Sequence, residues 1–412
     1  MSKSKIIILS AYACEPNKGS EPGIGWLWAL ELAKLGHQVK VITRYNNKDN
    51  IEKGINRQST ITNLEFFYYD LPKWLQIIKK SFFGIYFYYF FWQIGILKTA
   101  NKIHKKHKAD LIHHITFGVF RQPSFLWLLN IPFVFGPVGG AEMTPHKLLK
   151  TLPLSQYLKE LFRVFINYAY KFSPILNLMY AKTDLILCKT EDTSRFLPKY
   201  LKSKTYVAME IGIKKVNYNE KEDDNNDILR VLYVGRFLGW KGIHLGLEAV
   251  KKANNNCSKI EFTLIGKGPF ENSLKIKAKQ DSSIRFINWV TQEELFNYYS
   301  SFDCLLFPSF HDSSGNVILE AFSFGLPVIS LNLGGPNKLV NETCGFIIRQ
   351  ENKTVSEITD EIAQLLNNLQ KNKSVLLTPL RKGAFEQAEY YKIEKTVERT
   401  YSLIQDKLNR ID

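Results

Sequence analysis

Two pairs of charged residues in the second half of the chain have the types and spacing to bind a diphosphate and sugar hydroxyls. Arg236 and Lys241 stand five residues apart, directly after an apolar run at 230–234 that is predicted to be a strand. Two cations at the end of a parallel strand suit a diphosphate whose negative charge grows as it leaves. Asp312 and Glu320 are separated by seven residues. The alternative for the cations is a pair of solvated surface groups.

A Ser-Ser-Gly turn follows Asp312, and a helix is predicted to begin near Asn316. Free backbone amides at the start of a helix can bind a phosphate. We therefore expect the amides of Gly315, Asn316 and Val317 to bind one. Glu320 can then accept hydrogen bonds from a ribose, and Asp312 can reach hydroxyls of a sugar. The alternatives without any ligand are that Asp312 caps the N-terminus of the helix and that Glu320 lies on a solvated helix face.

The first half has a weaker signal of the same kind. Gly19, Gly23 and Gly25 open a predicted helix just after the first strand, where amides and the helix dipole can receive an anion. Glycines that merely permit tight packing explain the pattern about as well. His113 and His114 end another predicted strand and point to opposite faces of it, so only one can line a cleft. His114 is favoured because it lies nearer the strand end.

The segments GRFLGWKG, LIGKGPF, HDSSGNVILEAFSFGLPVIS and LGG together resemble the retaining glycosyltransferase family 4 (group 1) enzymes of the GT-B fold. In that family the first acidic residue of the Glu-x7-Glu motif stands where this chain has Asp312. The resemblance implies a UDP- or GDP-sugar donor, no further cofactor, and a lipid-linked or glycan acceptor. It also implies roles for individual residues: Arg236 and Lys241 at the diphosphate, Glu320 at the ribose, Gly315 to Val317 at phosphate and sugar, His114 near the reacting sugar, Gly19 at the donor, and Gly266, Gly268 and Trp289 near the base.

Apolar runs alternate with helix-length segments along the whole chain, which predicts parallel βαβ units and an α/β fold. The runs lie at 6–9, 39–43, 111–115, 133–135, 185–188, 230–234, 262–265, 304–307 and 327–330. Residues 217–227 are almost devoid of apolar side chains and read as a linker. We therefore expect two facing Rossmann-like domains, 1–215 and 229–412, joined by a linker at 216–228, with a hinge and an interdomain cleft. The last helix could pack back on the N-terminal domain.

The net charge of +16 is unevenly distributed. Residues 1–215 hold 31 Lys and Arg against 14 Asp and Glu, a net of +17, whereas the remainder is nearly neutral. A basic surface of this kind attracts an anionic membrane surface, nucleic acid or a phosphorylated substrate. The alternative is that the excess of lysine only reflects a lysine-rich proteome. Residues 81–97 form an uncharged aromatic run that fits a core helix, an interfacial helix or, least well, a membrane span.

These features predict a metal-independent transferase at the inner face of the cell membrane. The chain has no Asp-x-Asp pair to hold a metal, and its five cysteines are scattered, which fits the cytoplasm. Nucleic acid is not expected as a partner. The rival functions are a nucleotide-sugar epimerase or phosphorylase of the same fold, and a noncatalytic membrane or nucleic-acid binding protein. Neither the donor, the acceptor nor the linkage can be deduced from the residues.

Overall fold

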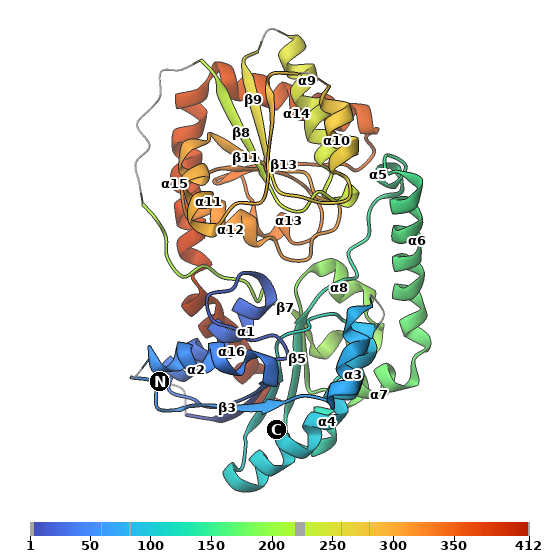
Figure 1. Ribbon diagram of the computed structural model, residues 1–412, viewed down its shortest axis with the longest axis vertical. Coiled ribbons are helices and arrows are strands. Elements are labelled where there is room, and N and C mark those ends of the chain that lie inside the picture. The colour runs from blue at the N-terminus through green and yellow to red at the C-terminus, as the bar shows by residue number, and fades with distance from the viewer. Residues whose placement is uncertain are drawn as a thin grey trace. The chain divides into compact units, whose positions relative to one another are not determined.

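The computed structural model describes residues 4–58, 60–81, 84–218, 227–256, 258–279 and 281–410. The chain forms two compact units, and each contains one parallel sheet with helices around it (Figure 1). Unit 1 consists of residues 1–141, 165–212 and 393–412, and unit 2 consists of residues 142–164 and 213–392. The expected α/β class with two Rossmann-like domains is thereby confirmed.

The sheet of unit 1 has seven parallel strands in the order β3-β2-β1-β4-β5-β6-β7. Its order reverses between β1 and β4, so the loops after these two strands flank the switch point where ligands bind in such sheets. The strands are β1 (Ile6–Ser10), β2 (Gln38–Arg44), β3 (Leu64–Tyr69), β4 (Leu111–His114), β5 (Phe133–Val138), β6 (Leu185–Cys188) and β7 (Thr205–Val207).

The sheet of unit 2 has six parallel strands in the order β10-β9-β8-β11-β12-β13, with its switch point between β8 and β11. The strands are β8 (Leu229–Val234), β9 (Ile260–Ile265), β10 (Ile284–Ile287), β11 (Cys304–Phe307), β12 (Val328–Leu331) and β13 (Gly345–Ile348). All nine predicted apolar runs are strands, shifted by at most a few residues at their ends.

Helices pack on the sheet of unit 1 and complete its core. They are α1 (Ser20–Lys34), α2 (Lys48–Asn56), α3 (Lys73–Gln76), α4 (Gly84–His107), α7 (Pro174–Lys182), α8 (Glu191–Phe196) and α16 (Ile393–Leu408). Helix α16 comes from the far end of the chain, and its Tyr401 hydroxyl lies 3.0 Å from Nδ1 of His113. The C-terminal helix therefore belongs to unit 1.

In unit 2, helices α9, α10 and α14 lie on one side of the sheet and α11, α12 and α15 on the other (Figure 1). The helices are α5 (His146–Leu149), α9 (Ile243–Asn255), α10 (Glu271–Ala278), α11 (Gln292–Ser301), α12 (Asn316–Phe322), α13 (Pro336–Leu339), α14 (Val355–Lys371) and α15 (Lys373–Tyr390).

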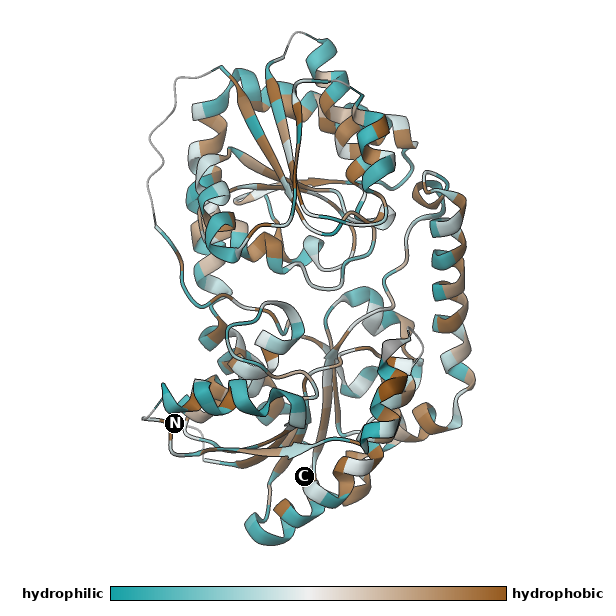
Figure 2. Ribbon diagram, in the orientation of Figure 1, coloured by the Kyte–Doolittle hydropathy of each residue, from teal (hydrophilic) through white to brown (hydrophobic). Residues whose placement is uncertain are grey.

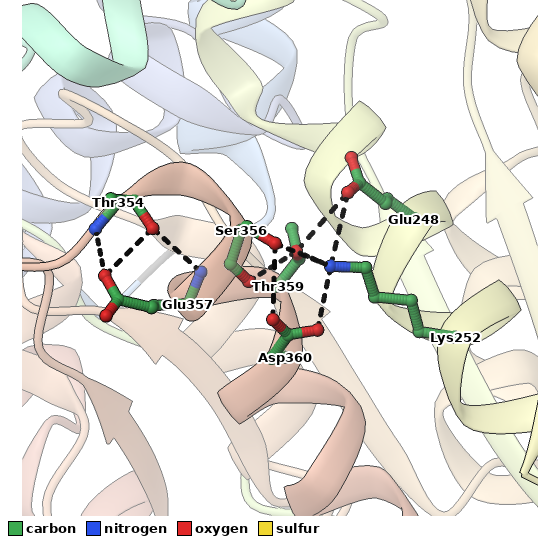
Figure 3. A network of polar contacts seen from close by, with 7 residues as sticks. All are labelled: Glu248, Lys252, Thr354, Ser356, Glu357, Thr359 and Asp360. Atoms are coloured by element: carbon green, nitrogen blue, oxygen red, sulfur yellow. Dashed lines mark hydrogen bonds and ion pairs between the residues drawn. The ribbon is translucent and has the colours of Figure 1, made fainter.

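A polar network joins α9 to the start of α14 (Figure 3). Lys252 Nζ lies 2.8 Å from both Thr359 Oγ1 and Asp360 Oδ1. Thr354 and Glu357 form a reciprocal capping box at the first turn of α14, which satisfies amides that the helix itself leaves unpaired. The network fixes the helix that covers this side of the second sheet.

The aromatic run at 81–97 is divided between the core and the surface. Residues 82 and 83 lie outside the described residues, and the rest begins α4. Tyr88, Tyr89 and Trp92 are buried in the core of unit 1, whereas Phe87 and Phe91 on the opposite side are exposed. Figure 2 shows the shift from apolar to hydrophilic residues along α4. Within the described ranges, every helix is too short or too polar to span a bilayer.

The division of the chain differs from the predicted domains of 1–215 and 229–412 in residues 142–164, which belong to unit 2 although they precede the linker. Residues 393–412 belong to unit 1, in line with the expectation that the last helix could pack back on the N-terminal domain. The boundary at 164 falls inside helix α6 (Leu154–Ala169). The first segment joins unit 2 because its polar side chains bind loops there, as Gln156 does with the backbone of Gly239. Residues 219–226 of the predicted linker lie outside the described residues.

Candidate active site

The loops after β8 and β11 meet at the switch point of unit 2. After β8 the chain turns at Gly235, exposes Arg236, and begins α9 at Gly242, whose φ of +67° is a left-handed conformation. A Cβ atom at Gly242 would lie 1.9 Å from the carbonyl oxygen of Pro308, in the loop after β11. Only glycine allows this approach. The predicted glycine-rich segment thus brings two functional loops together.

Lys241 and Asp312 form an ion pair across these two loops. Lys241 Nζ lies 2.5 Å from Asp312 Oδ2, and both side chains are largely buried. The ammonium group also lies 4.6 Å and 4.9 Å from the ring centroids of Trp240 and Phe307. Aromatic faces and partial burial strengthen the attraction between the two charges. The site therefore holds one cation in a fixed position at the end of β8.

The loop that carries Asp312 is supported by the two glycines of the LGG segment. The amide of Gly335 donates to the carbonyl oxygen of Asp312 at 2.7 Å. A Cβ atom would lie 2.2 Å from that oxygen at Gly334 and 2.3 Å from the oxygen of Ser314 at Gly335. Glycine is thus required at positions 334 and 335, where the LGG segment packs against the loop. The loop itself ends at Gly315, which has a φ of +117°. Helix α12 then begins at Asn316, as predicted.

Glu320 lies on α12 and is paired with a tyrosine from α11. The hydroxyl of Tyr299 donates to Glu320 Oε2 at 2.9 Å. Burial raises the pKa of Glu320 and outweighs the opposing effect of this hydrogen bond, so the net pKa is above its ordinary value. One carboxylate oxygen is thereby engaged by a neutral donor. The contribution of Tyr299 was not predicted, because no sequence pattern links it to a residue 21 positions later.

The predicted base-binding residues occupy different surroundings. Gly266 follows β9 with a φ of +148°, and its hypothetical Cβ would lie 2.0 Å from the carbonyl oxygen of Gly235. Gly268 approaches the oxygen of Phe237 equally closely. These glycines seat the β9 loop on the β8 loop. Trp289, by contrast, has 67% of its surface exposed, just after β10.

In unit 1 the glycines in the first turns of α1 mainly serve packing. Cβ atoms at Gly23 and Gly25 would each lie 2.1 Å from a backbone oxygen, whereas Gly19 has nothing within 4 Å. Glu21 accepts from the amide of Gly118 at 2.8 Å and so ties the start of α1 to the loop after β4. The packing explanation holds for Gly23 and Gly25, and a ligand role for Gly19 stays a prediction.

Both predicted histidines are fully buried. His113 lies 3.0 Å from the hydroxyl of Tyr401 and 2.7 Å from the carbonyl oxygen of Gly136. His114 Nε2 lies 3.3 Å from the hydroxyl of Tyr89, and its ring stacks on Phe135. Burial lowers the pKa of His113 to about 4 and that of His114 to about 3. Both imidazoles are therefore neutral and packed inside unit 1, and a substrate contact for either stays a prediction.

Helix α6 supplies unpredicted polar contacts to the loops after β8 and β11 in unit 2. Gln156 Oε1 accepts from the amide of Gly239 at 2.5 Å, and Glu160 Oε2 lies 3.1 Å from Nε2 of His311. His311 in turn stacks on Trp240 with ring centroids 4.2 Å apart. Burial raises the pKa of Glu160, but the hydrogen bond and charge of His311, together with the charge of Arg163, outweigh it and leave that pKa below its usual range. These residues brace the loops carrying Lys241 and Asp312.

Among the described residues, no cluster of three or more His, Cys, Asp or Glu side chains has the geometry to hold a metal ion. Arg236 and Lys241 both lie in the segment after β8 that borders the switch point of unit 2.

Sequence comparisons match the second unit most clearly. Residues 229–368 match the family model described as Glycosyl transferases group 1. A Klebsiella pneumoniae protein named "Uncharacterized 41.2 kDa protein in cps region" is 34% identical over 151 residues, which cover 36% of this chain and 40% of that protein. The "Capsular polysaccharide biosynthesis glycosyltransferase CapM" of Staphylococcus aureus is 28% identical over 148 residues, which cover 35% and 38%. The chain thus spans about two fifths of the length of these relatives.

Solved structures resemble the chain over almost its entire length. A glycosyltransferase from Rickettsia africae has a TM-score of 0.64 at 16% identity and covers 98% of this chain and 99% of its own. Anabaena Alr3699/HepE in complex with UDP has a TM-score of 0.58 at 14% identity and covers 98% and 100%. At this identity the likeness establishes the fold. The chain therefore has the GT-B fold of solved glycosyltransferases, and its residues 229–368 match the Glycosyl transferases group 1 family model.

Proposed function

We propose that this protein transfers a sugar from a nucleotide-diphosphate donor to a glycan or lipid-linked acceptor, with retention of anomeric configuration, in the synthesis of a surface polysaccharide. The observation that carries the proposal is the Lys241–Asp312 pair, which joins the two loops at the switch point of unit 2. The names of similar proteins support it, since CapM is described in capsular polysaccharide biosynthesis and AmsK of Erwinia amylovora in amylovoran biosynthesis. Membership of family 4 within group 1 is part of the same proposal.

The cations act on the leaving group. Departure of the nucleotide diphosphate builds negative charge, and Lys241 together with the exposed Arg236 stabilises it. Before the donor binds, Asp312 neutralises Lys241; on binding, a phosphate oxygen takes the place of the carboxylate. The freed Asp312 can then accept hydrogen bonds from hydroxyls of the donor sugar. The acceptor hydroxyl attacks the same face of the sugar from which the diphosphate leaves.

Glu320 holds the ribose in this scheme. Tyr299 occupies Oε2 of the carboxylate, so Oε1 accepts from a ribose hydroxyl. The backbone amides of Gly315, Asn316 and Val317 face phosphate and sugar, while Gly266, Gly268 and Trp289 border the base. HepE supports a nucleotide in this fold, since that protein is described in complex with UDP. UDP- and GDP-sugars are the donors we expect, with no separate cofactor and no metal ion.

The first experiment is a thermal-shift screen of the purified protein with UDP, GDP, ADP and their sugars. A ligand that binds only the native state raises the melting temperature, and a hundredfold excess over Kd contributes about 2.7 kcal/mol. We expect a shift with one nucleoside diphosphate and a smaller one in Lys241→Ala. If no nucleotide stabilises the wild-type protein, the donor site is wrong. Conversion of the donor to an isomer without acceptor would instead support an epimerase, and nucleotide binding without any turnover would support a noncatalytic protein.

We also propose that the protein works at the inner face of the cell membrane as a peripheral protein. The basic first half, with its net charge of +17, would attract anionic lipid, and exposed rings such as Phe87 and Phe91 on α4 suit the headgroup region. A membrane position would place the enzyme beside a lipid-linked acceptor. Recovery of the native protein in the soluble fraction of cells lysed at low salt would contradict this localisation.

A further inference from the structure

Helix α6 is oriented opposite to an ordinary amphipathic helix of a globular protein. Its polar residues Gln156, Glu160 and Arg163, at helical spacing, turn inward. Glu160 is 6% exposed, and Arg163 lies 3.0 Å from it and donates to the carbonyl oxygen of Glu142 at 2.8 Å. An amphipathic helix normally buries its apolar stripe, whereas this arrangement turns the apolar stripe of α6 away from the loops that its polar side binds.

The outer face of α6 consists of large apolar side chains. They recur at i, i+4, i+7 and i+11, which places them on one stripe. Their exposed fractions are 73% for Leu154, 54% for Leu158, 40% for Leu161 and 67% for Phe165. Figure 2 shows hydrophobic and hydrophilic residues alternating along this helix. The contacts with the loops after β8 and β11 explain why the inner face of α6 is polar. They do not explain why leucine and phenylalanine lie on the outer face, since exposing lysine and glutamate to water costs less free energy than exposing large apolar side chains.

The charges around this stripe are almost all positive. Residues 146–182 contain six lysines and arginines but one acidic residue, Glu160, which is buried beside His311. Lys150, Lys159 and Lys171 are exposed. A second copy of this chain would bring the same positive charges against them, whereas an anionic bilayer complements the lysines with its phosphates and the apolar side chains with its acyl chains.

We propose that the outer face of α6 is a docking surface for an anionic lipid bilayer, with its apolar side chains in the headgroup and upper acyl region. The inner face of the same helix holds the loops that carry Lys241 and Asp312, so docking fixes the helix on which these loops rest. The inference rests on the proposed membrane-side function. Vesicle binding needs no donor or acceptor, however, so its failure leaves the transferase proposal standing.

The test is co-sedimentation of the full chain with phosphatidylglycerol-containing and with pure phosphatidylcholine vesicles. The variant Leu158→Ser/Phe165→Ser removes two side chains of the stripe. The control Ile276→Ser/Val375→Ser removes two equally exposed apolar side chains from α10 and α15. We expect the α6 variant to bind anionic vesicles at least about tenfold more weakly than the wild-type protein, the scale for losing two inserted apolar groups. The control should bind like the wild-type protein.

Supporting results also include weak binding to phosphatidylcholine vesicles and release from anionic ones as salt rises toward 1 M, where the Debye length is about 3 Å. Melting temperatures of both variants should stay close to the wild-type value because the substituted side chains are exposed. The proposal is overturned if the wild-type protein ignores anionic vesicles at low salt, or if the α6 variant binds as well as the control. A wild-type dimer in sedimentation velocity that the α6 variant dissociates would also overturn it, in favour of self-association.

Discussion

The two units share one sheet topology but place different chemistry at their switch points. In unit 2 the loops after β8 and β11 bring together Lys241 and Asp312, 2.5 Å apart. In unit 1 the corresponding loops after β1 and β4 are joined by a hydrogen bond from the amide of Ala13 to Thr116 at 2.9 Å, and the Glu21 carboxylate binds the amide of Gly118 without a cation between these loops in the contacts described. The histidines that end β4 are buried and neutral.

The comparison separates what the fold supplies from what the side chains supply. Parallel sheets that reverse their order create a site at the carboxyl ends of the central strands, whatever residues occupy it. In unit 2 the loops after the two central strands each supply one charged group, Lys241 and Asp312, and the two groups pair directly. We therefore expect substitutions in unit 2 to change donor chemistry, and substitutions at the equivalent positions of unit 1 to change stability first.

The largest effect is expected for Lys241→Ala. Removing a group that stabilises the leaving diphosphate should lower turnover roughly a hundredfold or more while the fold stays intact. Arg236→Ala should behave similarly, and the two losses should not add because both groups act on one diphosphate. Steady-state kinetics with the donor found by thermal shift would measure this.

The matched control is Lys259→Ala, since Lys259 is an exposed lysine of the same unit in a surface ion pair of 3.7 Å. Its turnover should stay near the wild-type value. Equal rates for Lys241→Ala and Lys259→Ala would remove Lys241 from the mechanism and with it the main contrast between the units.

The next effect compares two glycines from the predicted donor site. Gly266→Ala in unit 2 forces a Cβ to 2.0 Å from the oxygen of Gly235 at a φ of +148°, so it should destabilise the protein by about 2 kcal/mol or more. Gly19→Ala in unit 1 meets nothing within 4 Å at a φ of −81° and should be tolerated. Urea unfolding curves of the two variants would check this. Similar midpoints would mean that the β8 and β9 loops do not need their close approach.

A third prediction concerns acid stability, in which unit 1 should be the more sensitive. The pKa of His113 is lowered to about 4 and that of His114 to about 3, below the 6.5 of a free imidazole. As pH falls from about 6.5 toward 4, the histidines of the unfolded chain become protonated while the two native histidines stay neutral. The free energy of unfolding therefore decreases, by a few kcal/mol in order of magnitude. The unfolding free energy at pH 7 should thus exceed that at pH 5, and His113→Asn should reduce the difference. Burial also lowers the pKa of His244 in unit 2, so this histidine too decreases the free energy of unfolding as the pH falls.

The smallest effect is expected from metal removal. If the cations after β8 take the place of a metal ion at the leaving group, EDTA should leave turnover unchanged. If EDTA abolished activity and magnesium or manganese restored it, Arg236 and Lys241 would not suffice to stabilise the leaving diphosphate without a metal ion.

The strands that sequence inspection missed are the four at the sheet edges: β3, β7, β10 and β13. Central strands of a parallel sheet are covered on both faces and therefore appear as continuous apolar runs, such as Leu185–Cys188. Edge strands are only half covered, and β10, with Arg285 exposed between apolar neighbours, shows no such run. For β10 the failure thus follows from incomplete burial, whereas β3 and β13 do contain apolar runs, LEFFYY and GFII, that were not identified as strands.

The candidate site was predicted unevenly for a similar reason. Arg236, Lys241, Asp312 and Glu320 could be found because they follow strands at fixed short spacing in glycine-rich segments. Tyr299, Gln156 and Glu160 carry no such signal, since each reaches its partner from a helix distant in the sequence. Likewise, whether His113 or His114 faced a cleft could not be read from strand alternation, because other elements bury both.

The α/β alternation, the central strands, the start of α12 at Asn316 and the charged segments after β8 and β11 could be predicted from the sequence, because they depend on local periodicity and short spacing. That residues 142–164 join the second unit, and that α6 turns its apolar stripe outward, depends on packing between distant parts of the chain. An amphipathic pattern gives the angle between two faces of a helix. Which face is buried depends on the partners that the rest of the chain provides, here the loops at Gly239 and His311.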